Sequence, residues 1–147
     1  MKILATRPER CTGCGACEIE CARTWFKVDD KEKSRIRIFP PAKEGQPFRI
    51  VVCNQNGACI DVCPTVALKR AKNGVVQLNK SLCVGCLSCV GFCPNQAMFY
   101  HPDFTEPFKC VACGKCVDVC PEDALYIAEV AEAPASVTDT WLQKEAV

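Results

Sequence analysis

Residues 83–94 read CVGCLSCVGFCP, and this spacing of cysteines recurs along the chain. Residues 11–21 (CTGCGACEIEC) and 110–121 (CVACGKCVDVCP) repeat it without exception as C-x2-C-x2-C-x3-C. Residues 53–64 (CNQNGACIDVCP) keep the frame, but asparagine stands at the second cysteine position, Asn56. We number these segments runs one to four in chain order, which makes the 53–64 segment run two. Their regularity indicates a repeated structural unit.

The composition limits what the repeats can be. Fifteen cysteines in 147 residues leave a thin apolar core, so disulfides, zinc or iron–sulfur clusters must help to hold the fold. The N-terminal MKILATRPER resembles no export signal, so we expect a cytoplasmic protein whose thiols stay reduced. No segment is apolar for long enough to span a membrane. A net charge of +1 indicates no nucleic-acid or membrane partner.

The cysteine spacing is typical of bacterial ferredoxins that bind 4Fe-4S clusters. Three cysteines in a tight loop can reach three corners of a cubane, and Gly13, Gly85 and Gly114 let the backbone approach it. The fourth cysteine of such a run ligates a different cluster. We expect this fourth cysteine to begin a helix, with the proline that follows it in runs two to four lying in the first turn.

Asn56 leaves two interpretations open. The cluster of run two could lack one iron, giving a 3Fe-4S cluster with three cysteine ligands. Alternatively it could keep four irons, with the Asn56 carboxamide or a water molecule on the fourth. In both cases fewer thiolates surround the cluster, which should raise its reduction potential.

The segments between the runs predict short strands, and hence an α+β fold. Residues 68–78 (LKRAKNGVVQL) predict a hairpin with Asn73-Gly74 at its turn. Residues 34–52 predict an inserted β-hairpin around a Pro/Gly-rich loop. Pro102-Asp103 predicts a further turn between two apolar stretches.

With these runs the chain resembles the four-cluster, polyferredoxin-like electron-transfer subunits of molybdenum and tungsten oxidoreductases. Residues 11–25 (CTGCGACEIECARTW) and 34–39 (SRIRIF) look most like the small ferredoxin-like subunit of tungsten aldehyde oxidoreductase. The resemblance implies a double ferredoxin-like domain over residues 1–127, made of two nested (βαβ)2 units, and a tail over 128–147. One unit would take the runs at 11–21 and 110–120, and the other the runs at 53–63 and 83–93. Pairing of consecutive runs is the alternative.

The resemblance also implies which ligands share a cluster. In three sets all ligands are cysteines and the cluster is 4Fe-4S, while the fourth set contains Asn56. The sets are Cys11, Cys14, Cys17 and Cys120; Cys110, Cys113, Cys116 and Cys21; Cys83, Cys86, Cys89 and Cys63; and Cys53, Asn56, Cys59 and Cys93.

The function implied is electron relay through four iron–sulfur clusters. The partners would be a large catalytic subunit with a tungsten or molybdenum pterin, a flavin- or NAD-handling subunit, or further copies of this chain. The sequence carries no catalytic triad, phosphate-binding loop or dinucleotide fingerprint, so we expect it to be non-catalytic. The alternatives are a ferredoxin subunit of a hydrogenase or carbon monoxide dehydrogenase, and a free polyferredoxin carrier. A zinc-bound structural module fits poorly, because zinc sites use pairs of cysteines.

A few residues outside the runs also carry expectations. His101 is the only histidine, and we expect it to be a solvated loop residue. We expect Trp25 and Phe26 to shield the cluster of run one from solvent. Trp141 and Leu142, in the tail, could anchor a partner subunit.

Overall fold

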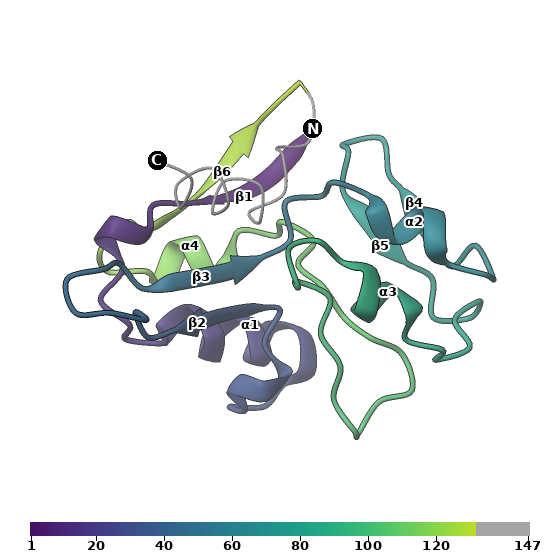
Figure 1. Ribbon diagram of the computed structural model, residues 1–147, viewed down its shortest axis with the longest axis horizontal. Coiled ribbons are helices and arrows are strands. Elements are labelled where there is room, and N and C mark those ends of the chain that lie inside the picture. Colours follow the sequence, from purple (N-terminus) through teal and green to yellow (C-terminus); the bar gives the residue numbers. More distant parts are fainter. Residues whose placement is uncertain (132–147) are drawn as a thin grey trace.

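The computed structural model describes residues 1–131 as two groups of short elements (Figure 1). The first group carries runs one and four, and the second carries runs two and three. Two 3-10 turns, Pro8–Arg10 and Lys31–Lys33, belong to the first group. The first group contains β1 (Lys2–Thr6), α1 (Ala16–Phe26), β2 (Ile36–Phe39), β3 (Arg49–Val52), α4 (Lys115–Val119) and β6 (Leu125–Glu129). The second contains α2 (Ala58–Val62), β4 (Leu68–Arg70), β5 (Val76–Leu78) and α3 (Ser88–Phe92).

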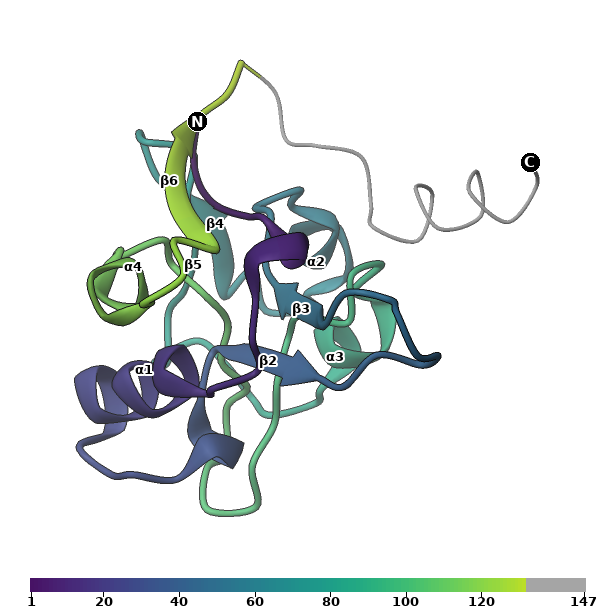
Figure 2. The same cartoon turned by 90° about the vertical axis from the view of Figure 1, so that its left-hand side faces the viewer.

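The beginning and the end of the described chain are joined in one sheet. Strand β1 pairs antiparallel with β6, from Lys2 opposite Glu129 to Thr6 opposite Leu125. Helices α1 and α4 pack together near this sheet, as Figure 2 shows, while α2 packs against α3. Runs one and four are thus neighbours in space, and so are runs two and three. Strand β6 continues to Glu129, two residues past position 127.

Two antiparallel hairpins complete the strands. The hairpin predicted at residues 68–78 is confirmed, because β4 pairs with β5 from Leu68 opposite Leu78 to Arg70 opposite Val76. Gly74 lies in its loop with φ +88°, a conformation that favours glycine. Within residues 34–52, β2 pairs with β3, and Ile36 lies opposite Val52. A single antiparallel bridge between Phe99 and Phe108 encloses the loop that contains Pro102 and Asp103.

The helices lie in different places from those expected. We predicted that the fourth cysteine would begin a helix, and this is wrong. Helices α2, α3 and α4 end directly before Cys63, Cys93 and Cys120, whose backbone is extended. The cause is the next residue, because proline forces the residue before it out of the helical region. Run one has Ala22 in place of proline, and α1 continues through its fourth cysteine to Phe26.

The core consists of two apolar clusters in which cysteines make up a large share. The first centres on Leu4, Ile36 and Leu125, and the second on Leu68 and Val76. None of these five side chains is more than 3% exposed. Within residues 1–131, no helix combines the length and the apolar character that crossing a membrane requires. Trp141 and Leu142 lie outside the described residues.

Candidate metal centres

The four runs share one backbone conformation around the second ligand position. In each run the residues immediately before and after this position have a left-handed φ, between +54° and +84°. These pairs are Gly13 and Gly15, Gln55 and Gly57, Gly85 and Leu87, and Ala112 and Gly114. Asn56 therefore occupies the same backbone frame as Cys14, Cys86 and Cys113. Run two therefore shares the loop geometry of the other runs and differs from them in the side chain at this position.

A short helix positions the third ligand of every run. Cys17, Cys59, Cys89 and Cys116 all lie within the first two residues of a helix, and all are buried. The second cysteines of runs one, three and four are exposed instead. Each loop therefore reaches from the surface to the interior within a few residues.

Backbone N–H groups point at the sulfur atoms. In runs two to four, the residue four positions after the fourth cysteine donates to its Sγ, at 3.3 Å for Cys63, 3.3 Å for Cys93 and 3.4 Å for Cys120. In run one the donor is Arg35 N–H, 3.2 Å from Cys21 Sγ. Hydrogen bonds of this kind favour a thiolate over a thiol and tune an iron–sulfur cluster.

One cavity is lined by the first three cysteines of run one and the fourth cysteine of run four. Cys11, Cys14, Cys17 and Cys120 lie around it. Its other walls include the apolar side chains Ile38, Ile50 and Leu125.

A second cavity has the reciprocal composition. Cys110, Cys113 and Cys116 of run four line it together with Cys21 of run one. Leu4, Ile36 and Trp25 contribute to its apolar walls. Trp25 therefore lies beside the cysteines of run four and Cys21, and not beside the first three cysteines of run one as we expected. Phe26 lines neither of these two cavities and stacks on Phe104, with ring centroids 4.8 Å apart.

A third cavity contains Asn56. Cys53 and Cys59 of run two line it with Cys93 of run three, and Lys109 forms part of the wall. The Asn56 Oδ1 accepts a hydrogen bond from the Ala58 N–H at 2.9 Å. An amide oxygen has two lone pairs, so one remains for a further partner.

The remaining predicted set joins run three with Cys63. Helices α2 and α3 pack together, and the sulfur atoms of Cys63 and Cys86 are close enough to interact electrostatically. Hydrogen bonds with Ser88 lower the pKa of the Cys86 thiol. The sulfur atom of Cys89 is likewise close enough to those of Cys83 and Cys86 to interact electrostatically.

Burial keeps several of these cysteines in the thiol form when no metal is bound. Burial raises the pKa of Cys17 and of Cys110 to about 12, and that of Cys59 to about 11. All fifteen cysteines are free, so no disulfide explains their arrangement. Thiols bind metal as thiolates, so a metal centre would replace these protons. Grouped sulfur atoms, apolar walls and N–H donors together suit an iron–sulfur cluster.

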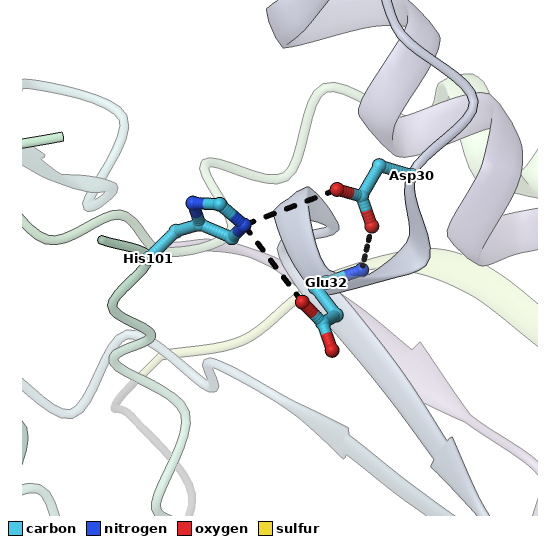
Figure 3. Close-up of side chains that lie close together, drawn as sticks. All are labelled: Asp30, Glu32 and His101. Carbon is cyan, nitrogen blue, oxygen red and sulfur yellow. Dashed lines mark hydrogen bonds and ion pairs between the residues drawn. The ribbon is translucent and has the colours of Figure 1, made fainter. Parts of the chain in front are cut away.

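His101 is not the solvated residue that we expected, since only 12% of its side chain is exposed. Its ring points toward the carboxylates of Asp30 and Glu32 (Figure 3). Its Nε2 lies 3.9 Å from Asp30 Oδ2 and 3.8 Å from Glu32 Oε2. Its Nδ1 accepts the Asp103 N–H at 3.0 Å, so in the neutral ring the proton is on Nε2. The Nε2–H group faces two carboxylates and so links the 101–103 loop to the 30–32 turn. Because Nε2 carries the proton of the neutral ring, it has no lone pair with which to bind a metal.

Comparison with known families shows that the four runs lie in two iron–sulfur domains. Residues 10–67 and residues 75–121 each match a sequence model described as a 4Fe-4S dicluster domain. Each matched segment contains two consecutive runs, whereas the helices that pack together come from runs one and four and from runs two and three.

Characterised relatives are subunits of larger enzymes. The thiosulfate reductase electron transfer subunit PhsB of Salmonella typhi is 34% identical over 101 residues, which are 64% of this chain and 53% of PhsB. One of the polysulfide reductase chains of Wolinella succinogenes is 34% identical over 108 residues, 67% of this chain and 56% of that protein. The chain therefore spans about half the length of these relatives.

Among solved structures, a chain of the active site complex BamBC of benzoyl coenzyme A reductase shares the fold, with a TM-score of 0.51. The match covers 99% of this chain and 88% of that chain at 20% identity, so it bears on the fold alone. Residues 10–67 and 75–121 both belong to the 4Fe-4S dicluster domains, and the chain is thus a multi-cluster iron–sulfur protein.

Proposed function

We propose that the chain holds four clusters in the crossed ligand sets and relays electrons through them. The observation that supports this most directly is the composition of the three cavities. Each is lined by the first three ligand positions of one run and by the fourth cysteine of the run that packs against it. Three clusters would be 4Fe-4S with four cysteines, and the fourth would include Asn56 or a water molecule. Several clusters in one small chain suit conduction, since a single cluster would suffice to hold the fold.

Electrons would enter and leave where ligands approach the surface. Cys14, Cys86 and Cys113 are exposed, so a partner could bring its own redox centre close to any of these three loops. In run three, which contains Cys86, the side chains of Val84 and Phe92 are 64% and 67% exposed, which suits a contact surface.

The partner we propose is a catalytic oxidoreductase subunit, with substrate chemistry carried out there. The resemblance favours a tungsten or molybdenum pterin enzyme, in particular an aldehyde oxidoreductase, with a flavin- or NAD-handling protein as the other partner. Anoxic purification of the tagged chain from its native cells, followed by metal analysis of the co-purifying proteins, tests this. Tungsten or molybdenum with a large subunit would support the proposal. Nickel would favour a hydrogenase or carbon monoxide dehydrogenase, and a lone brown monomer would favour a free carrier.

The crossed ligand sets can be tested with the fourth cysteines. In the crossed arrangement Cys93 ligates the cluster that includes Asn56, whereas pairing of consecutive runs would assign it to the cluster of run four. We expect Cys93→Ser to change the same electron paramagnetic resonance signal as Asn56→Cys. A change confined to the signal that Cys110→Ser also alters would contradict the crossed sets.

A further inference from the structure

Lys109 is a buried amine with three hydrogen-bond acceptors around it. The residue is 3% exposed, and it directly precedes the first cysteine of run four. Its Nζ donates to Gln55 Oε1 at 2.8 Å, to Val76 O at 2.6 Å and to Cys110 O at 2.8 Å. Three acceptors require three N–H donors, which only the ammonium form supplies. Lys109 therefore carries a positive charge in the interior.

This charge has no carboxylate partner within residues 1–131: the ion pairs there involve other side chains and the N-terminus. Burying an uncompensated charge is costly, so buried cations are normally neutralised by an anion. The oxygen atoms that accept from Lys109 are all neutral, and its one further hydrogen bond among the described residues joins it to the Cys53 side chain. The compensating charge must therefore come from another source close to Nζ.

The cysteines of the Asn56 cavity would supply that negative charge as thiolate ligands of a cluster. Lys109 lines this cavity together with Cys53, Asn56, Cys59 and Cys93. Burial raises the pKa of the Cys53 thiol, and the charge of Lys109 partly opposes this effect. It acts in the same direction on Cys59.

The surrounding hydrogen bonds hold the ammonium in place between two cavities. Gln55, which is fully buried, precedes Asn56 and accepts from both Lys109 Nζ and Val76 N–H through Oε1. Its Nε2 donates to Cys110 O at 2.9 Å. These bonds tie the loop of run two to the loop of run four, so Lys109 has little freedom to move away.

We propose that Lys109 is the internal counter-ion of the cluster held by Cys53, Asn56, Cys59 and Cys93, and that it raises the reduction potential of this cluster. The inference rests on the proposed function, since it requires a cluster in that cavity. Asn56 removes one negative ligand from this cluster, and Lys109 adds a positive charge beside it. Both changes favour the reduced state of this cluster. They would therefore stabilise an electron at this cluster, where the two groups of elements meet.

The first test replaces Lys109 by methionine, which is of similar length and uncharged. The matched control is Lys80→Met, because the Lys80 side chain is 67% exposed and its one ion pair within residues 1–131 is with Glu106. Asn56→Cys identifies the signal of the cluster in question. At a fixed electrode potential, Lys109→Met should lower the reduced-to-oxidised ratio of that cluster by at least about tenfold, which corresponds to about 59 mV for one electron. Lys80→Met should leave the ratio within about twofold.

A second variant keeps the lysine and neutralises its charge. Gln55→Glu retains an oxygen for Lys109 Nζ but places a carboxylate against it. It should lower the ratio in the same direction as Lys109→Met, because the new carboxylate cancels the charge of the ammonium. If Lys109→Met fails to load iron, an unchanged ratio in Gln55→Glu is the result that counts against the proposal.

An unchanged ratio in an iron-loaded Lys109→Met protein, or in Gln55→Glu when only that variant loads, would overturn the proposal. Failure of the crossed ligand sets is detected separately, because it appears in Cys93→Ser while the titration of the Lys109 variants remains measurable.

Discussion

Replacing Asn56 by cysteine should give run two the same ligand set as the other runs without disturbing its loop. The residues on both sides of Asn56 already have the left-handed conformation found around Cys14, Cys86 and Cys113. The hydrogen bond from Ala58 N–H to Oδ1 can be replaced, because Sγ atoms elsewhere accept from the N–H two residues further on. One example is Gln55 N–H to Cys53 Sγ, at 3.3 Å.

The expected stability change is therefore small, and the expected change in potential is large. Exchanging one hydrogen-bond acceptor for another should alter the free energy of unfolding by less than about 1 kcal/mol. A fourth thiolate adds a unit negative charge to the cluster. At about 4 Å and an effective dielectric constant of about 20, this is worth about 4 kcal/mol. Since a tenfold change is about 59 mV for one electron, the potential should fall by on the order of 100 mV.

The assay is a redox titration of anoxically purified protein, followed by electron paramagnetic resonance. Wild-type protein that shows a 3Fe signal under strictly anoxic conditions would rule out an intact four-iron cluster, and Asn56→Cys should then abolish the signal. Asn56→Asp is the matched control for Asn56→Cys, because it also adds a negative charge but keeps an oxygen atom as the ligand in place of sulfur. If Asn56→Cys loads iron fully and every cluster keeps its wild-type potential, then Asn56 does not face a cluster and our reasoning is wrong.

Three further predictions concern the loops, the helices and the thiols. At Gly85 (φ +72°) an added Cβ would lie 2.8 Å from the backbone oxygen of Thr105, whereas at Gly114 (φ +82°) the nearest atom is at 3.5 Å. The iron content per chain should therefore fall in Gly85→Ala. It should not fall in Gly114→Ala, where the substitution costs only about 1–2 kcal/mol of backbone strain. Equal iron contents in the two variants would contradict this prediction. Ala22→Pro, in the middle of α1, should lower the free energy of unfolding in urea by about 3 kcal/mol or more, and a loss below about 1 kcal/mol would show that α1 does not need its second half. In the metal-free chain, burial raises the pKa of Cys110 from 9.0 to about 12, so the folded state retains a proton that the unfolded state loses. The free energy of unfolding of the metal-free chain should therefore be highest below pH 9 and decline from there to about pH 12. Urea titrations measure it, with iron-loaded protein as the control. A free energy that does not change over this pH range would refute the burial argument.

Groups of candidate ligands can be recognised in the sequence because the spacing of a ligand loop is local. Three sulfur atoms must reach one cluster within seven residues, so the pattern alone identifies Cys83, Cys86 and Cys89 as a group. The hairpin at Asn73-Gly74 was predictable for the same reason. The positions of the helices could not be predicted in this way. Proline is favoured in the first turn of a helix, and this preference predicts helices that begin at the fourth cysteines. Here its effect on the preceding residue prevails, so the helices end before Cys63, Cys93 and Cys120.

Lys109 and Gln55 left no signal that sequence reasoning could use. Neither residue occupies one of the four ligand positions of a run. A single lysine before a ligand run is usually solvated. Their roles arise from contacts across 54 and 55 residues of chain, which depend on how run four meets run two. His101 was misjudged for a similar reason, because Asp30 and Glu32, which shield it, precede it by about seventy residues.

The position of Lys109 and Gln55 bears on how the chain can relay electrons as a single unit. Two dicluster domains connected only by linkers would vary in separation, and electron transfer between them would vary accordingly. Here Gln55 of run two bonds directly to the carbonyl of Cys110 in run four, and Lys109 bonds to both sides of that contact. The distance between the second and third cavities is thus fixed by buried hydrogen bonds, which persist because leaving any of these groups unpaired is costly. A cluster whose potential is raised by a fixed charge can serve as a reliable intermediate only if its neighbour is held equally firmly, and in this chain the same side chains provide both.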